Sequence, residues 1–491
     1  MIITMNKTRT RFAPSPTGYM HIGNLRTALF EFLIAKHEGG DFLLRIEDTD
    51  QERQVEGAVD VIYKTLKECG LNWDEGPDIG GDFGPYVQSE RLPMYKGYAE
   101  DLIKLGGAHY CFCSEEEIEA QRKEAESLGI SFKFNDPCKH LSAEEVQAKL
   151  DAGEPYVIRQ TIKDVGETYF DDEVYGRIEV DGDVLDEQIL IKSDGYPTYN
   201  FANIIDDHQM QISHVVRGNE YLSSTPKYNL IYDAYGWQRP TYVHVPPVMK
   251  DEHHKLSKRN GDASFQDLVA KGYLPDAIMN YIALLGWAPE TEQEIYTLDE
   301  LIKVFNIHRI SKSPAIFDID KLTWMNGVYL RNMDEATYFE TVRPYLEKAV
   351  HGPYDLKEIA KIIQPRIDIL TQIEESVDFF DTLVDYDLEM YRHKKMKTNP
   401  EVALKALKAS KEALEQFDNW DSMEALHDCL LALPKELEMK NGQVLWPIRT
   451  AISGKQFTPG GAIEIAFILG KDETLRRIQV GIDRLSEIVE E

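Results

Sequence analysis

One loop near the start of the chain carries residue types that could hold a phosphate group. The stretch from Arg11 to Phe30 reads RFAPSPTGYMHIGNLRTALF and contains Pro14, Pro16 and two glycines. Proline ends a strand because it lacks the N–H donor that a ladder needs, and glycine permits tight turns. His21 could donate a hydrogen bond to a phosphate oxygen at the start of a helix. By itself, the tripeptide H-I-G is more typical of an ordinary turn histidine.

A second loop concentrates positive charge in an otherwise acidic chain. The segment His253–Asp262 reads HHKLSKRNGD and places Lys255, Lys258 and Arg259 beside Ser257. Flexible lysines suit a multiply charged phosphate group that moves during a reaction. A lone basic pentapeptide is more often a solvated surface loop, so both interpretations stay open for this segment taken alone.

Three of the five cysteines lie close together in the sequence. The pattern is Cys111-x-Cys113 and then, after 24 residues, Cys138-x-His140. Two pairs of thiolate or imidazole ligands suit a tetrahedral zinc ion, and four protein ligands leave no open coordination position. We therefore expect one structural Zn²⁺ at these four residues. The alternative is three unrelated reduced cysteines and a surface histidine.

The composition limits the class of protein. The chain has 491 residues, of which 43% are hydrophobic, and a formal net charge of −31. This length predicts several domains. The negative charge argues against a protein that coats nucleic acid nonspecifically, because repulsion from phosphate would oppose binding. A nucleic-acid partner would need a local basic face. We find no signal peptide, and no apolar run reaches the roughly 18 residues of a membrane span. Five cysteines without an export signal predict a reducing, cytoplasmic compartment, with Cys69 and Cys429 as buried small apolar residues.

Regular elements must position these loops. TRTRFAP is strand-like, and GGDFLLRIEDTD suits a turn followed by a second strand. Between them, apolar residues recur at helical spacing, namely Leu25, Ala28, Leu29, Phe32 and Leu33. A helix is therefore expected from about Gly23–Asn24. The resulting strand–loop–helix–strand unit can bind phosphate at the helix N-terminus, although the loop is neither a Walker loop nor a G-x-G-x-x-G motif.

Taken together, three stretches closely resemble the glutamyl-tRNA synthetases of bacterial type, which are class I aminoacyl-tRNA synthetases. The stretches are RFAPSPTGYMHIGNLRTALF, FLLRIEDTD and WDEGPDIGGDFGPYVQSERLPMY. HIGN stands where the class has H-I-G-H, with Asn24 replacing a histidine at a position where glutamyl enzymes commonly vary. KLSKR resembles the partner signature K-M-S-K-S. Both signatures in the right order are far more specific than either one, and APSPTG favours the glutamyl over the glutaminyl branch.

The resemblance implies a ligase that activates L-glutamate with ATP and Mg²⁺ and transfers it to the 3′ end of tRNA(Glu). The residues implied in catalysis are His21, Lys255 and Lys258. Those implied in ATP binding are His21, Gly23, Asn24, Lys255, Ser257, Lys258 and Arg259. Those implied in glutamate binding are Arg11, Ser15, Glu47, Tyr199 and Arg217. Without the family, Glu47 would be interpreted as a surface partner of Arg45. The resemblance also implies that activation needs bound tRNA.

The resemblance extends to the metal and to the tRNA. Some glutamyl enzymes have a zinc knuckle of the type described above, and all four ligands are present here. Arg366, in QPRID, matches a position that the family associates with the third anticodon base. Arg331 is expected on a basic track that leads from KLSKR toward Arg366. The family expectation is a monomer, and some members also charge the glutamine tRNA.

The implied fold is an α/β multidomain architecture. A Rossmann-like parallel-sheet catalytic domain carries an inserted acceptor-binding domain and is followed by an all-helical C-terminal anticodon-binding region. The expected limits are 1–94 for the first catalytic half, 95–198 for the insertion with the zinc knuckle, 199–221 for the second half, 222–334 for a stem-contact region with KLSKR, and 335–491 for the anticodon-binding region. Stretches such as PEVALKALKASKEALEQF support a helical C-terminal region, although such helices could equally form a protein-interaction module.

Three other functions stay open. One is an adenylate-forming relative that glutamylates a modified tRNA nucleoside, but such a protein lacks the anticodon-binding region that this chain is long enough to supply. Another is a small-molecule nucleotidyltransferase with the same signatures, which would not need some 150 helical C-terminal residues. The last is a non-catalytic zinc-containing RNA-binding protein, against which the intact HIGN and KLSKR signatures argue.

Overall fold

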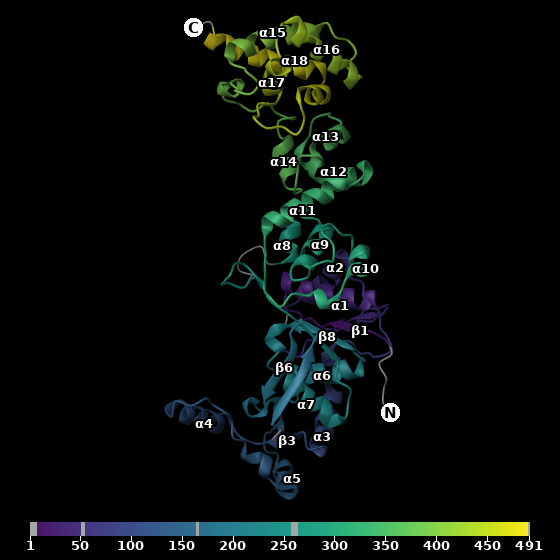
Figure 1. Cartoon of the computed structure of the whole chain (residues 1–491), viewed down its shortest axis with the longest axis vertical. Helices are drawn as coiled ribbons and strands as arrows, with labels where there is room; N and C mark the ends of the chain where they lie inside the picture. The colour runs from purple at the N-terminus through teal and green to yellow at the C-terminus, as the bar shows by residue number, and fades with distance from the viewer. Residues whose placement is uncertain (1–6, 51–54, 164–165, 257–263, 490–491) are drawn as a thin grey trace. The chain divides into compact units, whose positions relative to one another are not determined.

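The chain divides into two compact units. The computed structural model describes residues 7–50, 55–163, 166–256 and 264–489. Unit 1 comprises Met1–Val269 and Pro275–Asp318, and unit 2 comprises Ala270–Leu274 and Ile319–Glu491. Figure 1 shows the strands in the first unit and helices α12–α18 in the second. None of the helices described is both long and apolar enough to cross a membrane.

Unit 1 begins with the strand–loop–helix–strand arrangement that the sequence predicts. Strand β1 (Arg9–Phe12) pairs in parallel with β2 (Asp41–Leu44), and α1 (Ile22–His37) connects them. The helix begins at Ile22, because His21 caps it by accepting a hydrogen bond from the Gly23 amide. Gly18, in the loop before it, has a φ of 105°, which residues with a side chain rarely adopt.

A second set of elements continues this layer. Strands β8 (His214–Gly218) and β9 (Thr241–Val245) pair in parallel, preceded by α6 (Tyr199–Gln209) and connected by η5 (Asn219–Tyr221) and α7 (Thr225–Tyr235). The amide of Ser213 donates to the carbonyl of Arg9, so β8 starts beside β1. The hairpin of β5 (Glu167–Asp172) and β6 (Gly176–Asp181) extends the sheet to the order β6-β5-β9-β8.

The segment expected to be an insertion forms a small antiparallel sheet, in the order β3-β4-β7, while its strands β5 and β6 join the sheet of β8 and β9. Its elements are α3 (Leu92–Lys104), β3 (Ala108–Cys111), α4 (Glu115–Ser127), η3 (Pro137–His140), α5 (Ala143–Asp151), β4 (Val157–Gln160), η4 (Gly182–Val184) and β7 (Ile189–Ile191). Residues of α3 and of this sheet share one buried core with α6 and α7. Helix α4, blue in Figure 1, buries only Ala125.

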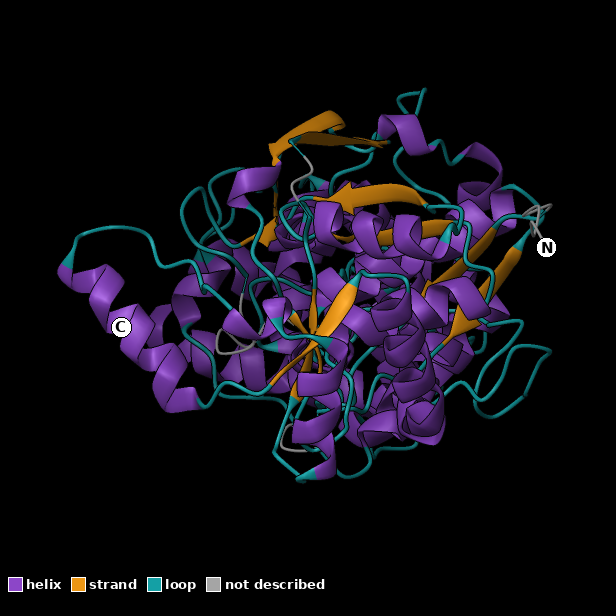
Figure 2. Cartoon of the chain, turned by 90° about the horizontal axis from the view of Figure 1, so that it is seen from below, coloured by secondary structure: helices purple, strands orange, loops and turns teal. Residues whose placement is uncertain are grey.

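The remaining elements of unit 1 surround the parallel strands. They are α2 (Ala58–Glu68), η2 (Gln88–Arg91), β10 (Val248–Met249), α8 (Phe265–Ala270), α9 (Pro275–Leu284), α10 (Leu298–Val304), η7 (Ile307–Arg309) and β11 (Ala315–Ile316). Helices α9 and α10 pack on α1, which is buried on most of its surface. In Figure 2 the strands are orange and the helices purple.

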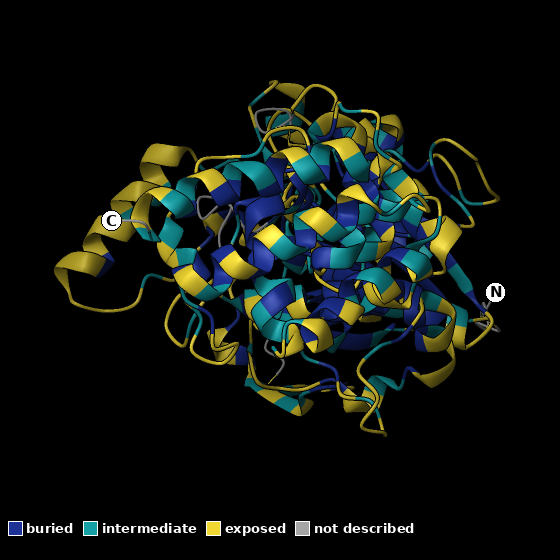
Figure 3. Ribbon diagram, turned by 90° about the horizontal axis from the view of Figure 1, so that it is seen from above, coloured by how far each residue is buried: buried dark blue, intermediate teal, exposed yellow. Residues whose placement is uncertain are grey.

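The helices and strands that the structure describes in unit 2 are all helices. Its elements are α11 (Ile319–Asn332), α12 (Glu335–Ala349), α13 (Leu356–Ile363), α14 (Gln372–Val377), η8 (Leu388–Tyr391), α15 (Pro400–Glu415), α16 (Met423–Glu436), α17 (Asn441–Ser453) and α18 (Ala462–Val489). Helices α15, α16 and α17 all pack against α18. Many helices alternate buried and exposed positions along their length, as Figure 3 shows. The predicted fold class, with a parallel-sheet domain before a helical C-terminal region, is confirmed.

Candidate active site

The five residues expected to hold glutamate all line one cavity of about 410 Å³ in unit 1. They are Arg11, Ser15, Glu47, Tyr199 and Arg217. Asn24, from the HIGN signature, lines the same cavity. A ligand bound by the two arginines would therefore lie next to the start of α1.

The parallel strands explain why these residues meet. Arg11 lies on β1, Glu47 follows β2, and Arg217 lies on β8, each near the carboxyl end of its strand. Tyr199 is the first residue of α6. Ligands of open α/β sheets bind outside the carboxyl ends of the strands, which is where this cavity lies.

Arg11 is held by two buried carboxylates. Its Nε lies 2.8 Å from Oδ1 of Asp207, and its Nη1 lies 3.1 Å from Oε1 of Glu31. Burial disfavours the charged guanidinium, but Asp207 and Glu31 together outweigh burial and raise the pKa of Arg11 above its ordinary value. Burial raises the pKa of Glu31 well above its ordinary range despite Arg11. The site therefore holds a permanently charged arginine in a fixed orientation.

Glu47 is the carboxylate of the cavity with a pKa near neutrality. Nη2 of Arg45 lies 3.0 Å from its Oε1, and Arg45 also binds Asp207. Burial raises the pKa of Glu47 to about 7, although Arg45 and Arg11 act against this rise. The carboxylate form of Glu47 offers a counter-charge to an ammonium group.

Arg217 is fixed by a chain of buried polar groups. Its Nε donates to Nε2 of His244 at 3.1 Å, and its Nη2 donates to Oγ1 of Thr225 at 2.7 Å. Nδ1 of His244 lies 2.6 Å from Oδ2 of Asp172, so the imidazole donates from Nδ1 and accepts at Nε2. Burial lowers the pKa of His244 despite Asp172, which favours this neutral form.

Aromatic rings complete the surroundings of Arg217. The rings of Tyr221, Tyr228 and Tyr242 have their centroids 5.3, 4.9 and 5.4 Å from the guanidinium carbon. Such rings stabilise a cation by cation–π attraction and limit its motion. The guanidinium therefore faces the cavity in a preset position.

His21, in the HIGN signature, contacts the KLSKR signature. Its Nδ1 accepts from the Gly23 amide at 3.0 Å, so its Nε2 carries the proton and donates to the carbonyl of Leu256 at 3.1 Å. A Cβ atom at Gly23 would lie 3.2 Å from His21 Nδ1, so a residue with a side chain would crowd the histidine that caps the helix. Leu256 belongs to KLSKR, and His21 also forms a β-bridge with Ser264.

Leu256 and Ser264, the described residues on either side of positions 257–263, both contact His21. Lys255 is exposed next to Leu256. Ser257, Lys258 and Arg259 lie outside the described residues. Spacing in the sequence cannot show that HIGN and KLSKR meet in space. In the structure, Leu256 and Ser264 both contact His21 of HIGN.

The cysteine cluster forms in the insertion with one unexpected member. The described residues contain one group that could hold a metal ion, made of Cys111, Cys113, Cys138 and Asp136, with one ligand atom of each within 4.8 Å of the others. His140 is exposed at the end of η3 and is not part of this group. The Cys69 thiol is buried as expected, whereas Cys429 is half-buried.

The cluster fits zinc in its donor atoms and spacing. Sγ of Cys113 and Sγ of Cys138 are 3.7 Å apart. A tetrahedral site with Zn–S bonds of about 2.3 Å has sulfur–sulfur edges of about 3.8 Å. Burial raises the pKa of Cys111 to about 11. Metal binding at this group would therefore release protons.

The two arginines expected to contact tRNA lie in unit 2. Nη1 of Arg331 lies 2.8 Å from Oδ1 of Asp368. Arg366 is exposed, and no side chain in the described part of the chain is recorded as its partner.

Sequence reasoning missed the carboxylates and the imidazole that orient the arginines. These are Glu31, Asp172, Asp207 and His244. One signal was present, because the pair Asp206–Asp207 interrupts the apolar stretch of FANIIDD on a helix. Both of these aspartates are buried, and buried carboxylates need cationic or hydrogen-bonding partners.

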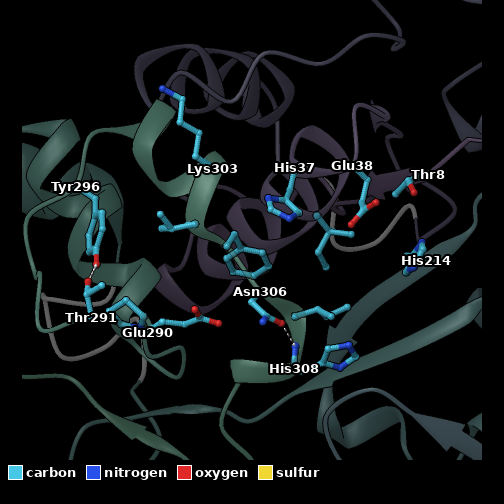
Figure 4. A pocket seen from close by; sticks show the side chains of 15 residues that line it. Thr8, His37, Glu38, His214, Glu290, Thr291, Tyr296, Lys303, Asn306 and His308 are labelled. Atoms are coloured by element: carbon cyan, nitrogen blue, oxygen red, sulfur yellow. Dashed lines mark hydrogen bonds between the residues drawn. The ribbon is translucent and has the colours of Figure 1, made fainter.

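A larger cavity, of about 780 Å³, lies elsewhere in unit 1. Figure 4 shows its lining, which includes Thr8, His37, Glu38, His214 and His308. Thr8 precedes β1 and His214 begins β8, so this cavity lies at the amino ends of the strands. None of the described residues that are expected to bind glutamate or ATP lines it, and we therefore place the chemistry in the smaller cavity.

Comparison with known proteins identifies relatives over almost the whole chain. Residues 7–324 match the family model "tRNA synthetases class I (E and Q), catalytic domain", and residues 337–482 match "Anticodon binding domain". A glutamate–tRNA ligase of Clostridium tetani is 59% identical over 480 residues, covering 98% of both chains. One from Clostridium botulinum is 60% identical over 483 residues, covering 98% of this chain and 99% of the relative.

A solved structure agrees with these matches. The crystal structure of a glutamate tRNA ligase from Elizabethkingia meningosepticum, in complex with its amino acid, superposes with a TM-score of 0.89 at 34% identity. The superposition covers 98% of this chain and 100% of that one. Sequence and fold therefore point to the same group of proteins.

Proposed function

The chain belongs to the class I tRNA synthetases for glutamate and glutamine and is a glutamate–tRNA ligase, and from this premise we propose how its own residues carry out the reaction. The observation that supports the proposal is the cavity in which Arg11, Glu47, Arg217 and Asn24 meet. The relatives are matched over 98% or more of their length, including the anticodon-binding model, which disfavours a shortened paralogue that modifies a tRNA nucleoside.

The first step joins glutamate to the nucleotide. Arg11 and Arg217 bind the two carboxylates, and Glu47 binds the ammonium group. The α-carboxylate attacks the α-phosphorus of ATP, supplied with Mg²⁺, and pyrophosphate leaves as glutamyl-adenylate forms. When His21 releases the carbonyl of Leu256, its Nε2 donates to the phosphate oxygens, and Lys258 supplies positive charge to them. Gly23 and Asn24 present the start of α1.

The second step transfers glutamate to tRNA. The terminal ribose hydroxyl attacks the carbonyl carbon of the adenylate, and AMP leaves. No covalent bond to the enzyme is needed, so the residues act by positioning and by stabilising charge. Ser15 and Tyr199 line the glutamate cavity and complete its polar wall. Lys255, Ser257 and Arg259 assist Lys258 at the phosphates.

Fixed guanidinium groups explain a preference for glutamate over glutamine. Glutamine has nearly the same shape, but its amide replaces a carboxylate oxygen with an N–H donor that would face an N–H donor of arginine. Such a mismatch in a buried site costs on the order of 2–3 kcal/mol or more. Asp207 and His244 support this discrimination because they prevent the arginines from turning away.

The assay that tests this proposal is amino-acid-dependent exchange between ATP and pyrophosphate, with and without tRNA(Glu). We expect exchange with glutamate, much less with glutamine, and a requirement for tRNA. Exchange without tRNA would contradict only the tRNA requirement. The absence of exchange under both conditions would contradict the proposed chemistry.

Glutamate use is expected to depend on the protonation of Glu47. Its pKa lies at about 7 because of burial, so lowering the pH through 7 converts it to the neutral acid and removes the counter-charge for the ammonium group. We expect kcat/KM for glutamate to fall about tenfold per pH unit below 7, as for one essential base. The measurement is kcat/KM at pH values between 5.5 and 8, where glutamate itself does not change charge.

Glu47→Gln is the matched variant for that experiment. It keeps the size of the side chain but cannot change charge, so its kcat/KM should be low and nearly independent of pH over the same range. A variant with the wild-type pH profile would show that another group causes the dependence.

The zinc and tRNA assignments complete the proposal. We propose one structural zinc ion bound by Cys111, Cys113 and Cys138, with Asp136 or His140 as the fourth ligand. The Sγ–Sγ spacing and the buried carboxylate support this site. When bound, the metal ties β3 to η3 and takes no part in the chemical steps. Arg366 is assigned to the third anticodon base and Arg331 to the backbone of the tRNA.

The domain limits stay a proposal as well. The expected boundary between the stem-contact region and the anticodon-binding region lies between residues 334 and 335. The two family models end and begin on either side of this point, at residues 324 and 337. The compact division of the structure falls earlier, at Ile319, so α11 groups with the helical unit.

A further inference from the structure

One carboxyl group of the glutamate cavity, that of Glu31, is buried beside an arginine that binds substrate. Glu31 lies on α1 and lines the cavity together with Arg11 and Glu47. The residue is only 1% exposed, and the hydroxyl of Thr10, on β1, donates to its backbone carbonyl at 2.8 Å. A carboxylate bound at Arg11 would therefore lie next to the Glu31 side chain.

The two oxygens of the Glu31 side chain have different surroundings. Oε1 accepts a hydrogen bond from Nη1 of Arg11 at 3.1 Å. Oε2 is buried, and no hydrogen-bond partner for it is found among the residues that the structure describes. An ionised oxygen buried without a donor is costly, whereas a protonated one becomes an O–H donor that lacks only an acceptor. A substrate carboxylate at Arg11 would supply that acceptor.

Arg11 by itself has few donors left for a substrate. A guanidinium has five N–H donors. Four hydrogen bonds from Arg11 are recorded: Nε and Nη2 donate to Asp207 at 2.8 and 3.2 Å, and Nη1 donates to Glu31 at 3.1 Å and to the carbonyl of Val216 at 3.5 Å. One N–H of Nη2 is therefore left over within the described part of the chain. A carboxylate has two oxygens, so a second donor beside Arg11 would complete its binding.

The charges around Glu31 favour its neutral form once a substrate carboxylate is bound. The ionised groups that face it are Arg11 from β1, Asp207 from α6 and Arg45 from the segment after β2. Burial already raises the pKa of Glu31 well above its ordinary range. A second carboxylate at hydrogen-bond distance would raise it further, because like charges so close together cannot both stay ionised and share one proton instead.

We propose that Glu31 is a further substrate-binding residue, which holds a proton in the complex and donates a hydrogen bond from Oε2 to the glutamate carboxylate that Arg11 binds. The proton comes from the solvent and is not transferred in either chemical step. The inference rests on the proposed function, because it requires that glutamate binds in this cavity. Glu31 acts as a neutral donor, in contrast to Glu47, which binds the ammonium group as an anion.

The direct test is a crystal structure of the full chain with L-glutamate at saturating concentration and near-neutral pH. We expect Oε2 of Glu31 within about 3.0 Å of a substrate carboxylate oxygen, as for an O–H···O hydrogen bond. Two ionised carboxylates would repel each other at this distance, so the contact itself identifies the shared proton. A larger separation of Oε2 from every substrate oxygen would overturn the proposal.

Two variants test the same donor by its effect on glutamate use. Glu31→Gln cannot ionise, but its amide nitrogen can replace the O–H donor while its oxygen still accepts from Arg11. It should keep KM for glutamate close to the wild-type value. Glu31→Leu has a similar volume without donor or acceptor, and it should raise KM for glutamate about tenfold or more, as for the loss of a hydrogen bond to a charged group.

The measurement is ATP–pyrophosphate exchange in the presence of tRNA(Glu) at varied glutamate. KM for ATP should change little in both variants, because the proposed contact is to the amino acid alone. A KM for glutamate that is much lower in Glu31→Gln than in the wild type would show that Glu31 is an anion that competes for Arg11. A wild-type KM in Glu31→Leu, or equal increases in both variants, would show that no donor at this position binds the substrate. Each of these results would overturn the proposal.

Glu38→Gln is the matched control, because Glu38 is an exposed carboxylate at the C-terminal cap of the same helix and does not line the glutamate cavity. It should leave KM for glutamate unchanged. Thermal unfolding of each variant shows whether the chain is still folded. If Glu31→Leu fails to fold, the crystal structure and Glu31→Gln still decide the question.

Failure of this inference and failure of the proposed function are distinguishable. Glutamate-dependent exchange by the wild type, together with no substrate contact at Oε2, would remove only the role of Glu31. The absence of glutamate-dependent exchange in the wild type would contradict the function itself.

Discussion

Replacing Arg217 with glutamine is expected to lower kcat/KM for glutamate by about 10²- to 10³-fold, as for the loss of one partner in a buried charge pair. The cavity would lose a guanidinium that His244 and Thr225 orient and that three tyrosine rings surround. The effect should appear mainly in KM for glutamate, with KM for ATP little changed, because Arg217 is assigned to a carboxylate of the amino acid. Steady-state aminoacylation at varied glutamate measures it.

Two further variants separate binding from simple destabilisation. His244→Phe removes the acceptor for Nε of Arg217 but keeps a ring of similar size, and it should raise KM for glutamate by a smaller factor than Arg217→Gln. Arg177→Gln removes an exposed arginine on β6 of the same sheet and should leave KM unchanged. If Arg217→Gln leaves KM for glutamate at its wild-type value, the assignment of the cavity is wrong.

Replacing Lys258 with alanine is expected to lower the turnover number by about 10²-fold or more, as for the loss of one strong transition-state donor. The physical reason is that negative charge grows on the phosphate oxygens as glutamate attacks, and a flexible ammonium group can follow that charge. His21 contacts Leu256 and Ser264, the two described residues that flank Lys258 in the sequence. Turnover is measured at saturating ATP and glutamate.

Affinity for glutamate should change little in the same variant, since Lys258 acts on phosphate. Lys250→Ala is the matched control, because it removes an exposed lysine shortly before the KLSKR loop. It should turn over at the wild-type rate. An unchanged turnover number for Lys258→Ala would remove the KLSKR loop from the catalytic step.

The sequence alone predicted the phosphate loops, the first strand–helix–strand unit and the family. These features are local: Pro14, Pro16 and Gly18 shape one turn, and the apolar spacing after Asn24 identifies one helix. The fold class, the family and the ligase function are confirmed by the structure and by the comparisons. HIGN and KLSKR carried this information because each is a short segment whose chemistry depends on its own residues.

The tertiary structure alone decided which groups support the site residues. Arg11 meets Asp207 across 196 positions of sequence, and Asp172 meets His244 across 72. Asp136 joins the three cysteines because η3 folds back on β3, whereas His140, two residues after Cys138, lies exposed. Spacing in sequence cannot reveal such partners, because burial and strand order bring them together, and a buried charge is stable only where the fold supplies its partner.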